Sequence, residues 1–243
     1  MSKNIHRRRR SVAIIIIGLL LAGGIWWQAG FTSDTPPSAP PTDKTSQLIK
    51  PDNLNQPLAT TELAKLPVKG RAPKADYSRD KFGNGWAKWK SCDTRQRILG
   101  RDLTDIEYNT DGCTVLSGVL NDPYTGKIIN FTRGTATSSA VQIDHVVALS
   151  DAWQKGAQNL DAATREQLAN DDLELIAVDG RSNQQKSNAD AASWLPPNKN
   201  FRCKYVARQI AVKIKYSLWV TPAEHDAMAK VLTGCPEERL PSP

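Results

Sequence analysis

The chain has 243 residues, of which 40% are hydrophobic and 23% are charged, and its formal net charge is +7. This composition excludes a wholly disordered chain and a polytopic membrane protein, and the length allows one or two domains. The charge is uneven, because residues 1–30 carry five positive and no negative charges, whereas residues 102–243 sum to −4. The net charge alone therefore does not indicate a protein that binds nucleic acid.

The first 31 residues have the pattern of a signal peptide or a signal anchor. Arginines at 7–10 precede an uncharged apolar run over residues 12–27. Positive charges before such a run place the rest of the chain outside the cytoplasm. Because Trp27 is bulky where a cleavage site favours a small residue, we favour an anchor in the cytoplasmic membrane over a secreted, cleaved form.

Residues 32–73 are predicted to be a disordered tether rich in Pro, Ser and Thr. Eight of the fifteen prolines fall in this stretch, and apolar residues are sparse. Such a composition cannot bury enough surface to offset the entropy that is lost on ordering. Residues 74–243 are predicted to form the folded domain.

Four cysteines lie beyond the tether, at Cys92, Cys113, Cys203 and Cys235. An even number outside the cytoplasm indicates two disulfides, for which three pairings are possible. We favour pairing between nearest neighbours, Cys92 with Cys113 and Cys203 with Cys235. The competing interpretation is a zinc site, which is weaker because the chain has no C-x-x-C pair.

The remaining pattern predicts an α+β fold rather than alternating strands and helices. Apolar and β-branched residues at 113–120 and 127–132 flank a stretch of turn residues, and together they predict a β-hairpin. Two further strands are predicted at 141–147 and 173–178. Helices are predicted at 150–159, at 161–169, from Ser182 to about Trp194, over 201–219 and from a capping box at Thr221.

Polar residues at the ends of these later elements carry the candidate chemistry. Asp144 and His145 end one predicted strand, and Asn183 and Lys186 lie in the helix that follows the next strand. A histidine can take a proton from water near neutral pH, and the side-chain oxygens of Asp and Asn suit a hard cation such as Mg²⁺. A cation with two protein ligands keeps positions open for water and phosphate oxygens, and Lys186 could meet a phosphate. This set outlines a phosphodiesterase site.

Three stretches together, residues 143–150, 173–178 and 182–187, resemble the HNH endonucleases of the ββα-metal fold. Within that superfamily the chain is most similar to exported HNH proteins of the actinobacterial type. Their domain is related to the C-terminal nuclease part of GmrSD-type restriction enzymes, and the similarity extends from Cys92 to Cys235. The resemblance implies a ββα-metal core with a preceding β-hairpin, extra helices and two disulfides.

The resemblance also implies roles for individual residues. Asp144 and Asn183 match the metal ligands, and His145 matches the general base. Lys186 matches the lysine that usually follows and is predicted to be catalytic together with His145. Glu174 stands where the pattern has its middle Asn, a residue that usually fixes the loop carrying the base. We expect Glu174 to take over this loop-fixing role as a hydrogen-bond acceptor, unless another residue does so.

Basic residues gather in two blocks, 65–101 and 199–215, which either line a track for phosphates or form a solvated surface. The residues singled out as possible phosphate contacts are Arg133, Arg181, Lys204 and Arg208.

The sequence thus predicts an exported endonuclease that hydrolyses phosphodiester bonds of nucleic acid, with DNA favoured, through a water activated by His145. The expected cofactor is a divalent cation, Mg²⁺ in the first place and Mn²⁺ as the alternative. The expected partners are the nucleic acid substrate and, if the N-terminal segment is uncleaved, the membrane; no protein partner is inferred. The alternative is a non-catalytic extracellular module that binds DNA or cell-wall polymer on a decayed HNH fold, and Glu174 is its best support.

Overall fold

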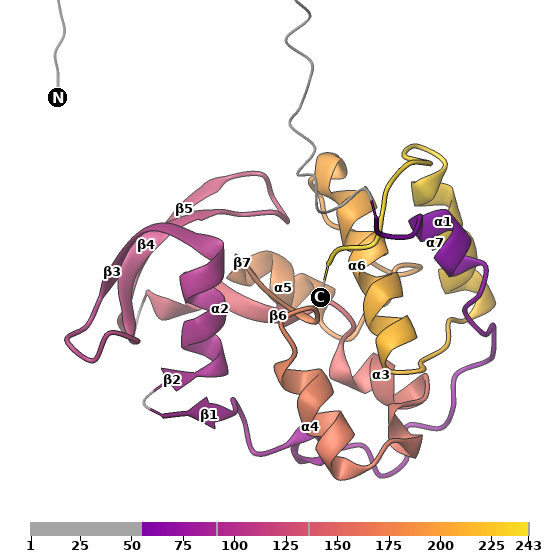
Figure 1. Cartoon of the computed structure of the whole chain (residues 1–243), viewed down its shortest axis with the longest axis horizontal. Helices are drawn as coiled ribbons and strands as arrows, with labels where there is room; N and C mark the ends of the chain where they lie inside the picture. Colours follow the sequence, from indigo (N-terminus) through magenta and orange to yellow (C-terminus); the bar gives the residue numbers. More distant parts are fainter. Residues whose placement is uncertain (1–54, 91, 136, 243) are drawn as a thin grey trace, which may run out of the picture. The chain divides into compact units, whose positions relative to one another are not determined.

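The computed structural model describes residues 55–90, 92–135 and 137–242 (Figure 1). The predicted export segment, residues 1–31, and the first part of the predicted tether lie outside these residues. Within the described part, none of the helices is long and apolar enough to cross a membrane.

The described chain combines helices with three small antiparallel sheets, which confirms the predicted α+β class. The strands are β1 (Lys88–Trp89), β2 (Cys92–Asp93), β3 (Leu103–Tyr108), β4 (Val115–Asn121), β5 (Ile128–Thr132), β6 (Val141–His145) and β7 (Leu175–Asp179). β1 pairs with β2, β3–β4–β5 form a three-stranded sheet in that order, and β6 pairs with β7. The α-helices are α1 (Ala59–Leu63), α2 (Thr94–Asp102), α3 (Leu149–Gln154), α4 (Ala162–Asn170), α5 (Gly180–Lys186), α6 (Arg202–Lys215) and α7 (Pro222–Leu232).

The predicted β-hairpin is confirmed as β4 and β5, and its turn is stabilised from within. The Asp122 carboxylate accepts a hydrogen bond from the Thr125 amide at 2.8 Å, and Gly126 takes a positive φ of 73°. The structure adds β3 to this hairpin as an edge strand. Most side chains of β3 are exposed and several are charged, so the apolar alternation that marks a half-buried strand is missing from its sequence.

The β6–β7 pair lies between two hydrophobic cores and so positions the residues of interest. Its residues Val141, Ile143, Leu175 and Ala177 pack with α2 and the β3–β5 sheet. Ile176 and Val178 face the opposite way, into the core that includes α3, α6 and α7. Because successive side chains of a strand point to opposite faces, neighbouring residues of β6 enter different environments.

The helix predicted from Ser182 to about Trp194 is much shorter in the structure. Asp179, rather than Ser182, caps α5 by accepting a hydrogen bond from the Ser182 amide, so the helix begins at Gly180. It ends at Lys186 because Ser187 adopts a positive φ of 50°. Gly180 packs so closely on the 3₁₀ turn before β6 (Ser138–Ala140) that an added Cβ would lie 2.0 Å from the Ser139 carbonyl oxygen.

The other predicted helices are present with altered limits. The helix predicted at 150–159 divides at Gly156, whose φ is 123°, into α3 and a short 3₁₀ turn at Ala157–Asn159. The next prediction is confirmed as α4, which Asp161 caps. The helix predicted over 201–219 is α6, and α7 begins as predicted, with Thr221 accepting a hydrogen bond from the Glu224 amide.

The prediction that the tether reaches residue 73 is wrong for its last part. Ala59 and Leu63 of α1 are buried in the same core as α6 and α7, and Leu66 is buried beside them. Leu58 also bridges to Arg239 near the C-terminus. Three well-placed apolar residues are enough to hold this short segment on the helices, although their number was too small to predict a folded segment.

Both favoured disulfides are present, which excludes the zinc alternative for these residues. Cys92 pairs with Cys113, tying β2 to the loop that precedes β4. Cys203 pairs with Cys235, tying the first turn of α6 to the segment after α7. A thiol in a disulfide is not available to coordinate a metal.

Candidate active site

The candidate residues come together because β6, β7 and α5 follow one another as strand, strand and helix. Gln142 and Asp144 lie two residues apart on β6 and therefore point to one face, on which α5 packs. Asn183 and Lys186 lie one turn apart on α5 and face the strand. The Asn183 amide donates to Gln142 Oε1 at 2.9 Å, and Lys186 Nζ donates to Asp144 Oδ1 at 2.9 Å.

Asp144 is buried, with 5% of its surface exposed, and both of its carboxylate oxygens accept hydrogen bonds. Oδ1 accepts from Lys186, and Oδ2 accepts from the hydroxyl of Tyr124, which reaches in from the turn of the β4–β5 hairpin. Burial raises the pKa of Asp144, and the ammonium of Lys186 and the Tyr124 hydroxyl oppose that rise. The carboxylate is thus held in one orientation by two elements that are distant in sequence.

Lys186 is also buried, which differs from the expectation that it meets a phosphate. Only 1% of its surface is exposed, and its ammonium group donates to the His145 carbonyl at 2.7 Å as well as to Asp144. A lysine in this position neutralises the buried carboxylate and fixes the backbone at the end of β6. Both contacts of Lys186 support the local structure of the site.

His145 ends β6 and faces away from Asp144, toward Trp86 and the end of α4. Its Nε2 lies 3.0 Å from the Ala169 carbonyl oxygen. A carbonyl can only accept, so in the neutral ring we assign the hydrogen to Nε2, which leaves the lone pair on Nδ1. The ring also stacks on Trp86 with centroids 5.6 Å apart and planes 10° apart.

Burial lowers the pKa of His145 to about 3, and the positive charges of Arg79 and Lys186 add to this effect. The ring is therefore neutral at physiological pH, and its Nδ1 can accept a proton. The stacked indole and the hydrogen bond to Ala169 together fix the orientation of the ring.

Glu174 precedes β7 and holds the chain just after His145. Its side chain accepts a hydrogen bond from the Val147 amide at 3.2 Å, and its backbone carbonyl accepts from the Val146 amide at 2.9 Å. Burial raises the pKa of Glu174 well above its ordinary value. Its other oxygen, Oε1, has no hydrogen-bond partner among the described residues. A neutral carboxylic acid fits both observations, because it can be buried with less penalty than a carboxylate.

Asp144, His145 and Asn183 line one cleft of about 410 Å³, together with residues that the sequence pattern did not identify. Those further lining residues include Arg79, Trp86, Arg95 and Gln142. They come from the segment before β1, from α2 and from the middle of β6, and no local motif connects them to the Asp-His pair. Tyr124 was also missed, because in the sequence it is only one of several residues in a turn.

Both expected metal ligands line this cleft, the carboxylate of Asp144 and the amide of Asn183, whose nitrogen donates to Gln142. This donor chemistry fits a hard cation such as Mg²⁺. The described part of the chain contains no cluster of three or more His, Cys, Asp or Glu side chains that could hold a metal ion. A cation held here would therefore have two protein ligands and would take its other ligands from water and substrate.

None of the four residues expected to contact phosphates lines the cleft. Arg208 donates to the backbone carbonyls of Leu173 and Leu175 and is used in holding β7. Arg133, Arg181 and Lys204 are exposed and do not line the cleft, although Arg133 lies near enough to Arg95 for its charge to lower the pKa of that arginine.

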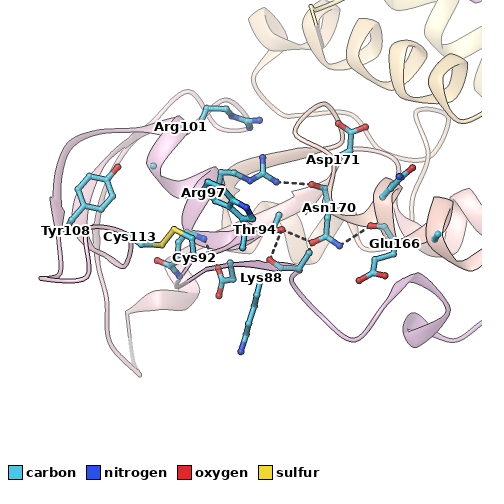
Figure 2. A pocket seen from close by; sticks show the side chains of 18 of the residues that line it. Lys88, Cys92, Thr94, Arg97, Arg101, Tyr108, Cys113, Glu166, Asn170 and Asp171 are labelled. Atoms are coloured by element: carbon cyan, nitrogen blue, oxygen red, sulfur yellow. Dashed lines mark hydrogen bonds between the residues drawn. A yellow bond between two sulfur atoms is a disulfide. The ribbon is translucent and has the colours of Figure 1, made fainter.

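A larger hollow of about 1000 Å³ lies between α2 and α4 and is shown in Figure 2. Its charged side chains are largely paired with one another or with the backbone. Arg97 donates to the Asn170 carbonyl, and Lys215 lies 2.6 Å from Asp171. No histidine lines this hollow. Asp144, His145 and Asn183 line the smaller cleft, so the candidate active site is assigned there.

Comparison with known proteins identifies the family of this chain. Residues 93–231 match the family model described as GmrSD restriction endonucleases, C-terminal domain, and this range contains Asp144, His145 and Asn183. A protein of Arthroderma benhamiae named "Uncharacterized secreted protein" is 39% identical over 191 residues, which cover 76% of this chain and 90% of that protein. The chain therefore belongs to the family of GmrSD restriction endonuclease C-terminal domains.

Proposed function

We propose that this protein is an exported, metal-dependent endonuclease whose β6–β7–α5 unit is a ββα-metal core of the HNH type. The observation that carries the proposal is the meeting of Asp144, His145 and Asn183 in one cleft. Two disulfides and a relative named as a secreted protein support export. In this proposal residues 1–31 are the signal or anchor, and the nuclease domain begins before α1 rather than at residue 74.

Nδ1 of His145 takes a proton from the water that attacks the phosphorus atom. The ring is neutral before substrate binds, and the negative charge of a phosphate in the cleft raises its pKa from about 3, which makes it a stronger base as the substrate arrives. Trp86 and the Ala169 carbonyl keep the ring in position for this transfer.

Asp144 and Asn183 would hold the cation, which, when bound, would stabilise negative charge on the reacting phosphate and on the leaving oxygen. Tyr124 and Lys186 orient the Asp144 carboxylate, and Gln142 orients the Asn183 amide so that its oxygen remains for the cation. Glu174 fixes the backbone that follows the base. The catalytic residue is His145, and the others act by holding it, the cation or the backbone in place.

Cleavage of supercoiled plasmid by the full-length chain in detergent tests this proposal. With Mg²⁺ or Mn²⁺ we expect nicking and linearisation, and we expect His145→Ala to reduce the rate by about 10²–10⁴-fold. His225→Ala is the matched control, because that partly exposed histidine lies on α7, outside the cleft. Cleavage that survives His145→Ala, or that is indifferent to EDTA, would contradict the mechanism.

The non-catalytic alternative rested on Glu174 in place of the middle Asn. Because Glu174 makes a hydrogen bond to the Val147 amide, the substitution is compatible with an intact site. The alternative predicts binding of DNA or cell-wall polymer without turnover, and no loss of that binding on Asp144→Ala. The plasmid assay separates the two functions.

A further inference from the structure

We infer that Arg79 and Arg95 form a binding site for backbone phosphates of the nucleic acid, beside the general base. The inference rests on the proposed function and adds the residues that hold the substrate. Both arginines line the cleft that contains Asp144 and His145, and they come from different segments, a 3₁₀ turn (Arg79–Phe82) and α2.

Arg95 is held in the cleft by the backbone. Its Nη2 donates to the Val141 carbonyl at 3.0 Å and to the Ser138 carbonyl at 3.4 Å, at the point where β6 begins. These contacts fix the guanidinium, which forms no ion pair with a carboxylate of the described residues. Burial and the nearby positive charge of Arg133 lower the pKa of Arg95, and the negative charge of Asp93 opposes this in part.

Arg79 brings a second charge close to the base. Its positive charge is among the causes that lower the pKa of His145, so the guanidinium lies near the ring. The side chain is exposed, and it makes no hydrogen bond or ion pair with any residue that the structure describes. An arginine in this situation offers a planar set of donors to an incoming anion.

Most arginines elsewhere in the fold are already engaged. Arg71 pairs with Asp151 and Asp190, and Arg101 pairs with Asp102. Within the described residues, neither Arg79 nor Arg95 has a carboxylate partner within ion-pair distance. Two cations that lack an ion-pair partner beside a cleft favour an anionic ligand, because the ligand supplies the opposite charge.

The ligand chemistry is that of a phosphate ester, and we assign it to the phosphates that flank the scissile bond. Lys186, which the sequence suggested for this task, is buried against Asp144 and cannot reach a substrate without breaking that ion pair. Arg79 and Arg95 are the cations that line the cleft with Asp144, His145 and Asn183. They therefore take the role that the sequence had given to Lys186 and to four basic residues that do not line the cleft.

Salt-dependent binding of a fluorescein-labelled duplex DNA of 20 base pairs tests the inference. Fluorescence anisotropy is measured with the full-length chain in EDTA, over a series of KCl concentrations, for wild type and for Arg79→Gln with Arg95→Gln. Loss of two phosphate contacts should reduce the slope of log K against log salt by about 1.8 and weaken binding by roughly 60-fold at 0.1 M salt. The matched control is Arg181→Gln with Lys204→Gln, which removes the same net charge from exposed positions outside the cleft.

An equal loss of DNA affinity in both double variants would overturn the inference, since only the total charge would then matter. Unchanged affinity in both double variants would also overturn it. Because Arg95 also supports the start of β6, Arg79→Gln is measured alone. That exposed side chain has no described partner to lose, and its variant should reduce the slope by about 0.9, roughly eightfold at 0.1 M salt. An unchanged slope in this variant would overturn the role of Arg79 whatever the double variant shows.

Inorganic phosphate at millimolar concentration is the second arm, and it distinguishes a site for free phosphate from a site for a strand. We expect it to displace no more DNA than KCl of equal ionic strength; stronger displacement that depends on Arg79 and Arg95 would overturn the assignment to a strand. Because binding in EDTA involves no turnover, this assay tests the phosphate site independently of the proposed nuclease activity. Arginine-dependent binding by an inactive protein contradicts only the nuclease, whereas cleavage with arginine-independent binding contradicts only this site.

Discussion

The low pKa of His145 makes the stability of this protein dependent on pH in a defined direction. In the unfolded chain a histidine titrates near pH 6.5, but in the folded protein burial lowers its pKa to about 3. Between these values the unfolded chain binds a proton that the folded chain does not. The stabilising contribution is therefore present above pH 6.5 and is lost as the pH falls toward 3.

The magnitude follows from the difference between the two pKa values. Each unit by which the pH falls within this window lowers the free energy of unfolding by about 1.4 kcal/mol. The loss over the whole window is about 5 kcal/mol. His145→Gln removes the titrating imidazole, and the side-chain amide of the glutamine can still donate to the Ala169 carbonyl. Relative to this variant, wild type should lose about 2.3 kcal/mol between pH 6.5 and pH 4.5.

The assay is urea unfolding at 25 °C in EDTA, with the disulfides intact, at several pH values from 7.5 to 4.5. Other titrating groups cancel in the difference between wild type and His145→Gln. The series is repeated in 0.5 M NaCl, where the slope should persist, because burial is the main cause and salt does not screen it. A difference that stays constant from pH 7.5 to 4.5 would show that the folded protein accepts a protonated His145 and would refute the reasoning.

Four further outcomes follow from the structure, each measured by urea unfolding. Burial raises the pKa of Glu174, so wild type should lose stability relative to Glu174→Gln by about 1.4 kcal/mol per pH unit above pH 4.5; a pH-independent difference would contradict this. Lys186→Met leaves the buried carboxylate of the site unpaired and should cost about 3–5 kcal/mol, and a loss below 1 kcal/mol would argue against the ion pair. Cys92→Ser with Cys113→Ser opens a disulfide with a sequence separation of 21 residues and should cost about 3 kcal/mol, whereas an unchanged midpoint would argue against that pairing. Thr221→Ala should cost about 1 kcal/mol through loss of the α7 cap, and Thr221→Ser, which keeps the hydroxyl, should restore it.

Features that depend on neighbours in the chain were predictable from the sequence. The β4–β5 hairpin has its turn residues between two apolar runs, and α7 has Thr221 at its cap. The Asp144-His145 pair and the Asn183-x-x-Lys186 spacing are also local patterns. Periodicity, turn chemistry and caps arise from steric effects and hydrogen bonds within a few residues, so the sequence displays them directly.

Prediction failed where local signals were weak or competed with one another. Both Asp179 and Ser182 are good cap residues, and only the structure shows that Asp179 starts α5. The segment around α1 is rich in proline, but Ala59 and Leu63 find a partner surface on helices that come more than 140 residues later. A composition rule cannot anticipate a partner so distant in the chain.

The sequence by itself determined the class of fold and the Asp-His and Asn-x-x-Lys motifs on which the proposed chemistry rests. It favoured one of three disulfide pairings, which the structure confirms. Only the tertiary structure decided what surrounds those residues. It placed the Tyr124 hydroxyl on Asp144, turned Lys186 inward and brought Arg79 and Arg95 to the cleft. Such contacts join segments tens of residues apart, and they are set by how the strands and helices pack together, which no local pattern records.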